Sequence, residues 1–163
     1  MNTTRCLIAL AALSLTAGAS VAEDAAPAKF YKFDFLIKEV DGVKVLNSRA
    51  YSLLTSTQNK SEIRAGSKIP YMSSTTEYQQ VDVGVNIDVL NIKEMPDRLA
   101  FYIVVEVSSL PAGAADPLRP PMRQNKWSSS LVVPLKKATL LFSSDNVDSK
   151  SQMQVEVTAT PIP

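Results

Sequence analysis

The sequence contains no histidine, and its single cysteine, Cys6, lies close to the start of the chain. Without histidine, serine–histidine–aspartate and cysteine–histidine catalytic groups are excluded, as are metal sites built on imidazole. Only five glycines occur among 163 residues, and none forms a glycine-rich phosphate-binding motif. We therefore expect a protein that is not an enzyme and that holds neither a cofactor nor a metal ion.

The chain also lacks an excess of charge and a long hydrophobic run. It carries 17 basic and 16 acidic residues. Nucleic acids and anionic membranes call for a clear basic excess in their partners, so neither is expected to bind. The longest apolar run, Leu7 to Ala17, is shorter than the roughly 20 residues of a transmembrane helix. We expect a mature chain that does not span a membrane.

The first 22 residues have the features of a secretory signal peptide. Arg5 is their only charged residue, the apolar run follows it, and Ser20-Val21-Ala22 offers small residues before a cleavage site between Ala22 and Glu23. We expect an exported protein of the periplasm or outer membrane, with a flexible leader over residues 23–28 and one domain over residues 29–163. Because Cys6 falls within the predicted signal, this domain has no disulfide and must be stabilised by its core.

The stretch from Val81 to Val89 has the clearest pattern in the chain. Its odd positions are all Val or Ile, whereas its even positions are Asp, Gly or Asn. Successive side chains of a strand point to opposite faces, so this alternation predicts one strand with a buried face and a hydrated face, from about Tyr78 to Ile92. A helix would distribute the same apolar side chains around its circumference.

Further strands are predicted on both sides of this one. We expect an all-β protein, an antiparallel β-sandwich or partial barrel of about 7–9 strands, with no substantial helix after the signal peptide. Asp41-Gly42 predicts a two-residue hairpin turn. The other strands are expected at Tyr31–Ile37, Val43–Leu54, Glu62–Arg64, Lys68–Tyr71, Arg98–Ser109, Trp127–Val133, Ala138–Phe142 and Gln152–Thr160.

Some of these strands carry more detailed expectations. Gly66 is expected to end the short strand at Glu62–Arg64, and Pro70 indicates an edge strand or a bend. The nearly continuous apolar run from Leu99 to Val107 predicts a central strand covered on both faces. The inward side chains of the strand after the Asp41-Gly42 turn are expected to be Val43, Val45, Tyr51 and Leu53.

Carboxylates are the remaining candidates for chemistry. Asp82 and Asp88 share the polar face of one strand, but at the usual rise they lie roughly 20 Å apart. A glycosidase-type pair needs about 5 to 10 Å, so a hydrolase using these two groups is disfavoured. Asp145, Asn146 and Asp148 could together hold a weak calcium ion. Their segment lacks the glycine and the bidentate glutamate of a calcium loop, which favours a solvated turn.

Exposed aromatic and basic side chains are candidates for binding. Tyr71, Tyr78 and Tyr102 could contact a glycan or another small ligand. The proline-rich stretch Leu110–Met122 contains Arg119 and precedes Arg123. It could form a polyproline II segment that a partner recognises, or simply a stiff surface loop.

Other side chains have two interpretations as well. Trp127 begins an alternating strand, which favours a core anchor over a binding platform. A basic ligand patch competes with ordinary solvated charges at Arg64, Lys68, Lys136 and Lys137.

The order of several motifs points to a family. Arg-Ala-Gly-Ser-Lys-Ile-Pro-Tyr at residues 64–71 is followed by Val-Gly-Val-Asn-Ile-Asp-Val at residues 83–89, and an apolar strand then ends in Val-Glu-Val-Ser-Ser at residues 105–109. With Arg123–Phe142, this order resembles the C-terminal β-domain of the bacterial secretins, the outer-membrane rings of type II and type III secretion and of type IV pili. The resemblance covers roughly Glu62 to Phe142.

The sequence departs from the family pattern at several points. Leu90-Asn91 stands where secretins usually have Thr-Pro, and Ser143-Ser144 stands where they have a Gly-Gly pair. We expect no counterpart of the ring-building N-terminal domains, since about 40 residues cannot hold them before Glu62. The resemblance therefore implies a shared β-domain rather than pore formation, and it implies no catalytic residues and no cofactor.

Two classes of function follow. The first is an exported, non-enzymatic, secretin-like protein that binds another envelope or secretion-system protein in secretion or pilus assembly. The alternative is a periplasmic module that binds a glycan or small ligand through exposed tyrosines.

Overall fold

The computed structural model describes residues 27–72, 77–110, 121–146 and 150–163. The predicted signal peptide, its cleavage site at Ala22 and Glu23, and most of the leader lie outside these residues. The described residues form eight strands, and they include no helix that is long and apolar enough to cross a membrane. The strands are β1 (Phe30–Asp41), β2 (Lys44–Ser56), β3 (Ser61–Met72), β4 (Tyr78–Met95), β5 (Arg98–Ser109), β6 (Arg123–Pro134), β7 (Thr139–Asp145) and β8 (Gln152–Ile162).

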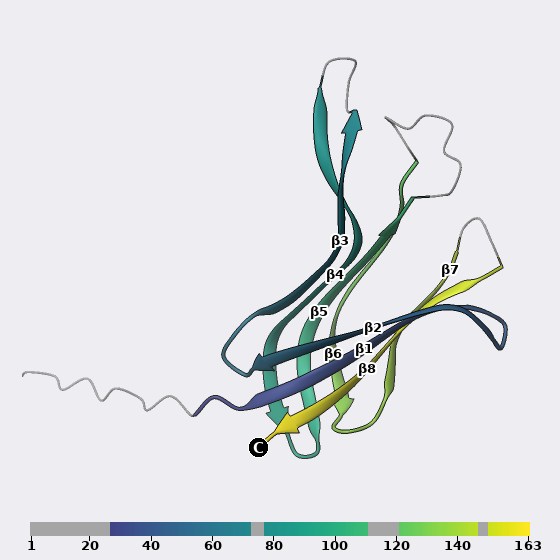
Figure 1. Ribbon diagram of the computed structural model, residues 1–163. Helices are drawn as coiled ribbons and strands as arrows, with labels where there is room; N and C mark the ends of the chain where they lie inside the picture. The colour runs from purple at the N-terminus through teal and green to yellow at the C-terminus, as the bar shows by residue number, and fades with distance from the viewer. Residues whose placement is uncertain (1–26, 73–76, 111–120, 147–149) are drawn as a thin grey trace, which may run out of the picture.

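These strands make two four-stranded antiparallel sheets that pack face to face (Figure 1). Sheet A has the order β2-β1-β8-β7, and sheet B has the order β3-β4-β5-β6. The predicted all-β sandwich is confirmed. Sheet B is a run of consecutive hairpins, whereas sheet A inserts β8 beside β1 and therefore joins distant parts of the sequence.

The core lies between the sheets and follows the predicted alternation. Phe33 and Phe35 of β1 face Ile87 and Phe101 of sheet B, and all four are at most 2% exposed. The rings of Phe33 and Phe101 meet edge to face, with centroids 5.1 Å apart, which is a favoured aromatic geometry. The inward residues of β4 and β8 are buried as their period of two predicts.

The hairpin predicted at Asp41-Gly42 is present, but its two turn residues are Gly42 and Val43, because Asp41 pairs with Lys44. Gly42 has φ +59, which glycine adopts without a steric cost. Val43 is therefore fully exposed in the turn, and Val45 is half exposed, so the prediction that both point inward is wrong. Leu46 is an extra residue in the β1–β2 register and forms a bulge beside it. Tyr51 and Leu53 do pack on the core.

A second bulge lies in β4, where Asn91 and Ile92 oppose Phe101 alone. Asn91 has φ +54, a conformation that asparagine tolerates better than most residues. The bulge shifts the alternation by one residue, so Ile92 is buried although Leu90 faces outward. The departure from the secretin pattern at Leu90-Asn91 thus coincides with a change of face.

β5 is a central strand, as predicted, but only one of its faces is covered. Leu99, Phe101, Ile103 and Val105 are buried, whereas the alternate residues between them are half-buried. A two-layer sandwich has nothing to place on the outer face of sheet B, so the prediction of cover on both faces is wrong. β3 likewise does not end at Gly66 but continues to Met72, and as an edge strand it accommodates Pro70 as expected.

Candidate functional site

The sheet edges are the first candidate surface. β2 and β7 form the edges of sheet A, and β3 and β6 form those of sheet B. Within the described residues no further strand pairs with these four edges. Edge strands present unpaired backbone N–H and C=O groups, which another strand can satisfy. Apolar side chains accompany three of them, because Leu54 on β2, Val132 on β6 and Leu140 on β7 are each more than half exposed.

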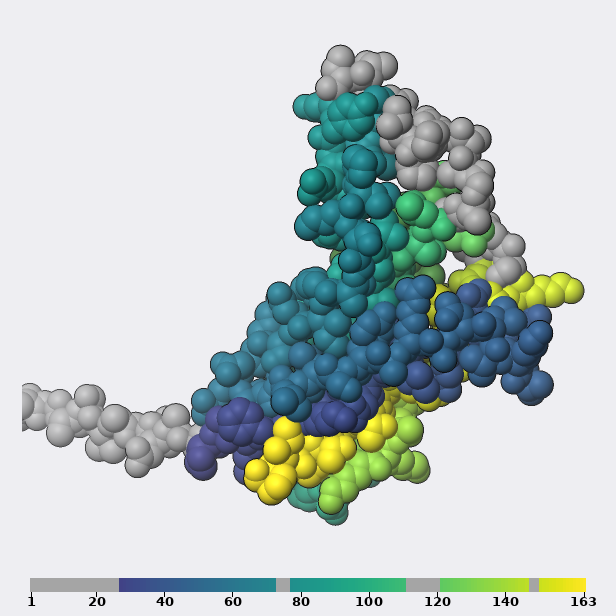
Figure 2. Space-filling view, viewed as in Figure 1, coloured from purple at the N-terminus to yellow at the C-terminus, as the bar shows by residue number. Residues whose placement is uncertain are grey.

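The second candidate surface is an arm made by β3 and β4. β4 pairs with β5 only from Val85 onward, whereas Tyr78 to Gly84 pair with β3 alone. In Figures 1 and 2 this two-stranded ribbon stands out from the body of the sandwich. An isolated two-stranded ribbon is at best marginally stable in water, so the arm is well suited to contact with a partner.

A glycine pair marks the base of the arm. Gly66 pairs directly with Gly84. A Cβ atom on Gly66 would lie 2.2 Å from the carbonyl oxygen of Val83, and one on Gly84 would lie 2.2 Å from that of Ala65. Gly84 also has φ +150, a region that glycine strongly favours. The Val-Gly-Val motif is therefore explained by a close backbone approach where the arm leaves the sheet.

Ser108 secures this departure point from β5. Its side chain is only 3% exposed. The backbone N–H of Gly84 donates to Ser108 Oγ at 3.0 Å, and Ser108 Oγ donates to the carbonyl of Asp82 at 3.2 Å. The hydroxyl thus satisfies backbone groups of β4 just where pairing with β5 ends. The first serine of the Val-Glu-Val-Ser-Ser motif therefore stabilises the base of the arm.

Charged side chains cross the outer face of sheet B beside the arm. Arg64 lies 2.7 Å from Asp88 and 3.2 Å from Glu62, and Lys60 reaches both carboxylates at 3.3 and 3.4 Å. Partial burial raises the pKa of Asp88, but hydrogen bonds from Arg64 and Lys60 outweigh it, so the pKa lies below its ordinary value. The hydrogen bond to Asp88 in turn raises the pKa of Arg64. At this end of the outer face, the two cations and the two carboxylates therefore neutralise one another.

Asp82 and Asp88, the two candidate catalytic carboxylates, belong to separate ion pairs. Asp82 pairs with Lys68 at 3.1 Å, whereas Asp88 belongs to the Arg64 and Lys60 cluster. Each acid therefore has its own cation, and the two do not face a common site. Arg64 and Lys68 are engaged in these pairs, and Lys136 and Lys137 lie in the turn between β6 and β7. The four basic residues do not form one patch.

The three predicted tyrosines lie in two regions. Tyr71 and Tyr78 are on the arm, opposite Gln79 and Met72 respectively, so they point to opposite faces of the ribbon. Tyr102 is on β5 and pairs with Leu90, roughly 40 Å along β4 from Tyr78 at the usual rise. It lines an open hollow of about 330 Å³ together with Ala100, Val132 and Lys93. The tyrosines do not make a single platform.

Trp127 is partly buried and packs against the core. Its ring stacks on that of Phe142, with centroids 5.8 Å apart and planes 14° from parallel. Trp127 belongs to β6 and Phe142 to β7, so the stack joins the two sheets on the side where these edges lie. The interpretation of Trp127 as a core anchor is confirmed.

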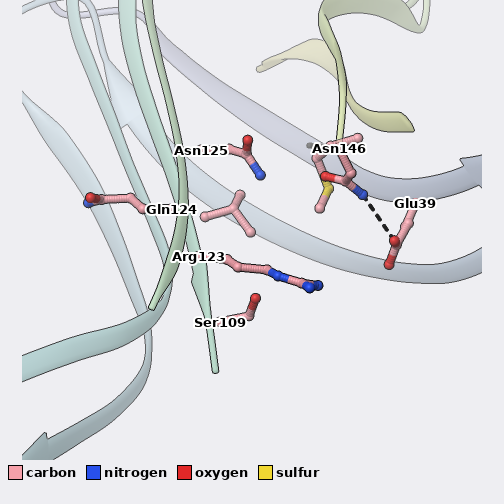
Figure 3. Close-up of a pocket in the computed structure, with 8 residues that line it drawn as sticks. Glu39, Ser109, Arg123, Gln124, Asn125 and Asn146 are labelled. Atoms are coloured by element: carbon pink, nitrogen blue, oxygen red, sulfur yellow. Dashed lines mark hydrogen bonds between the residues drawn. The ribbon is translucent and has the colours of Figure 1, made fainter. Parts of the chain in front are cut away.

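The third candidate surface is a cleft between the sheets where β5 ends and β6 begins (Figure 3). Glu39 Oε1 accepts hydrogen bonds from Asn146 Nδ2 at 3.0 Å and from Ser151 Oγ at 2.6 Å. Arg123 and Asn125 extend from β6 toward this group, whereas Gln124 points away. Sequence patterns give no sign of this cleft, because its residues come from strands far apart in the chain.

Asn146, one of the candidate calcium ligands, lines this cleft. Asn146 bonds to Glu39 and Ser151, and Asp145 accepts from Gln152 at 3.1 Å, an arrangement that fits the turn interpretation. Asp148 lies outside the described residues. No cluster of acidic residues that could hold a metal ion occurs in the described part of the chain. Arg119 and the centre of the proline-rich stretch also lie outside the described residues.

Comparison with known proteins bears on the fold. No family model matches the sequence, and no curated protein matches it. Solved secretin structures do match. They include the type II secretion system secretin GspD from Escherichia coli K12, with a TM-score of 0.54 and 11% identity over 83% of this chain and 48% of that one.

Two further secretins show the same relationship. XcpQ from Pseudomonas aeruginosa matches with a TM-score of 0.56 and 12% identity over 83% of this chain and 57% of that one. The type III secretin InvG from Salmonella matches with a TM-score of 0.51 and 11% identity over 83% of this chain and 64% of that one. The chain thus spans about half to two thirds of the length of these proteins. The predicted resemblance to the secretin β-domain is confirmed as a likeness of fold.

Proposed function

We propose that this chain is an exported, non-enzymatic assembly component of the bacterial envelope that works in protein secretion or pilus biogenesis. It joins a further envelope protein, or further copies of itself, through the edges of its sheets. The observation that carries the proposal is the set of four open edges on a sandwich with the secretin fold. Each edge offers a strand of backbone donors and acceptors to a partner.

The edges are built for association rather than protection. Proteins that keep their edges unpaired usually place lysine or proline along them. Here Leu54, Val132 and Leu140 are exposed on β2, β6 and β7. β3 carries Pro70 and three charged side chains, and β6 carries Pro134 and two, whereas β2 and β7 have no proline. Association is thus expected mainly through β2 and β7.

Size exclusion with light scattering tests this proposal on the purified chain. We expect a mass well above that of one chain, and we expect a double variant, Leu54→Lys with Leu140→Lys, to lower it because charge disfavours strand pairing. Val43→Lys is the control, since Val43 is fully exposed in a turn and lies on no edge. A wild-type monomer that crosslinks to no envelope protein in cells overturns the proposal.

Export is proposed from the sequence and has its own test. When the full chain is expressed in a Gram-negative host, we expect an envelope-associated form whose N-terminal residue is Glu23. An Ala22→Arg variant should accumulate uncleaved, because signal peptidase requires a small residue there. An uncleaved wild-type chain in the cytoplasm contradicts this part of the proposal.

A second candidate function is glycan or small-ligand binding at Tyr102. The hollow beside this ring carries Lys93 and Ser130 as polar neighbours, and an aromatic face with polar groups around it suits a sugar. A ligand that binds only the folded state raises the unfolding temperature, so a thermal-shift screen against envelope glycans tests it. The shift should disappear in Tyr102→Ala.

A further inference from the structure

The outer face of sheet B changes in charge from one end to the other. Toward the arm, the carboxylates of this face are paired with cations, as Asp88 is with Arg64. Around Tyr102, the described outward side chains of β4, β5 and β6 include Lys93 and Arg98 but no acid. Within the described residues, neither of these two cations makes an ion pair. The end of the face that holds the Tyr102 hollow is therefore positively charged.

The acids of the β4–β5 hairpin beyond Val89 do not offset this charge. Glu94 follows Lys93 in the chain but points to the other face, where it forms an ion pair with Lys29 just before β1. Asp97 lies in the turn between the two strands. β6 contains no acidic residue, and β3 stops pairing with β4 at Val89. The ammonium group of Lys93 is thus available to an anionic ligand.

The bulge in β4 is what brings Lys93 to Tyr102. Leu90 faces outward, so an unbroken alternation would turn Lys93 toward the interior of the sandwich. The extra residue at Asn91 and Ile92 reverses this, because Ile92 is buried and Lys93 points outward. Bulges next to active sites re-aim side chains in the same way. The bulge therefore adds a cation to the face that carries the tyrosine ring.

Polar groups flank Tyr102 on two sides. Ser130 of β6 lies directly opposite Tyr102, and Lys93 of β4 is its diagonal neighbour, with the two residues roughly 7 to 8 Å apart. The small side chain of Ala100, which lies between Lys93 and Val132, leaves the space that forms the hollow of about 330 Å³. An open hollow of this kind suits a ligand that lies flat on the aromatic ring, as the C–H face of a sugar does.

We propose that the Tyr102 hollow binds an acidic glycan through one uronic acid unit. The C–H face of the sugar lies on the Tyr102 ring, its carboxylate pairs with Lys93, and Ser130 bonds to a hydroxyl group. Arg98, two residues before Ala100 on the same face, attracts the next acidic sugar of the glycan. The inference rests on the second candidate function and specifies its ligand class, and it does not depend on assembly through the sheet edges.

Calorimetric titration with two matched oligosaccharides tests the ligand class. The first is a linear trimer of galacturonic acid, and the second is the same trimer with every carboxyl group methyl-esterified, which removes the charge but keeps the sugar rings. We expect the purified chain to bind the acidic trimer at least about threefold more tightly, a modest factor because the ion pair is exposed to solvent. Added salt should reduce the difference, because it screens exposed charges.

The failure of this inference can be told apart from the failure of the second candidate function. Equal affinity for the two trimers, or binding of the ester alone, overturns the acidic ligand but leaves glycan binding at Tyr102 standing. Binding of neither trimer overturns the inference, and the thermal-shift screen then decides the second candidate function separately.

Variants at Lys93 locate the carboxylate. Lys93→Gln should lower the affinity for the acidic trimer at least about threefold and leave the affinity for the ester unchanged. Lys93→Arg keeps the charge and should bind the acidic trimer as wild type does. Lys44→Gln removes an exposed lysine from β2 in the other sheet and should change neither affinity. Because Lys93 is exposed, its variants are expected to fold. Undiminished binding of the acidic trimer by Lys93→Gln refutes the assignment.

Discussion

Gly66 and Gly84 face each other across β3 and β4 so closely that neither position has room for a Cβ atom. The contact fixes the point at which the two-stranded arm leaves sheet B. A side chain at either position would push the carbonyl groups of the opposite strand away. Because neither residue has a side chain, the two backbones can approach this closely at the base of the arm.

Gly84→Ala should lower the free energy of unfolding by about 1–3 kcal/mol, because the new methyl group meets backbone atoms and φ +150 is unfavourable for alanine. Urea unfolding measures the effect. Gly42→Ala is the matched control, since φ there is also positive but nothing lies within 4 Å of the new Cβ. If both variants lose the same stability, the close approach at Gly84 has no energetic weight.

Ser108→Ala should loosen the base of the arm. It removes the acceptor of the Gly84 N–H and a donor to the Asp82 carbonyl in a buried position, which costs about 1–3 kcal/mol. Hydrogen exchange should show faster exchange of the Gly84 amide. Ser128→Ala on the exposed face of the neighbouring strand serves as the control. Unchanged protection of Gly84 would show that the hydroxyl is dispensable.

The ion cluster on sheet B predicts a pH dependence. The pKa of Asp88 lies below its ordinary 3.8 in the folded state, so its contribution to stability is present above that pH and is lost as the pH falls through the folded pKa. Urea unfolding at about pH 6 and about pH 3 should show a smaller loss for Asp88→Asn than for wild type. Asp82→Asn, with a side chain 61% exposed, should behave like wild type. Equal losses in all three proteins contradict this account.

The stack of Trp127 on Phe142 gives a direct view of the sandwich. Trp127 is the only tryptophan, so its fluorescence reports on this contact. Phe142→Ala should shift the native emission to the red and cost about 2 kcal/mol of stability, because the ring is half-buried. Phe30→Ala, at a ring 56% exposed, should do neither. An unshifted emission in Phe142→Ala would mean that the stack does not shield the indole.

The strands themselves could be predicted from the sequence because the alternation of apolar and polar residues is a local signal. The period of two in β4 and β8 predicts both their existence and their buried faces. The faces of Val43 and Val45 could not be predicted, since the alternation was followed across a turn and a bulge whose positions depend on pairing with β1. The uncovered face of β5 likewise depends on how many layers the fold has.

The candidate surfaces were much harder to predict from the sequence. A glycine inside a strand signals a bulge or a close approach, and Gly84 gave that signal, but its partner Gly66 is known only once the register is known. The cleft between the sheets draws residues from β1, β5, β6 and β8, which no spacing in the sequence connects. The order of motifs, in contrast, could be recognised in the sequence, and it predicted the secretin fold.

The placement of β8 has a consequence for how the chain folds. Phe30 pairs with Ile162, so the centre of sheet A is made from strands at opposite ends of the described sequence. Sheet B can form from successive hairpins as the chain emerges, whereas sheet A must wait for β8 to arrive. Until then β1 exposes Phe33 and Phe35 to solvent. The newly made chain is therefore expected to need protection by a chaperone longest at its earliest strand.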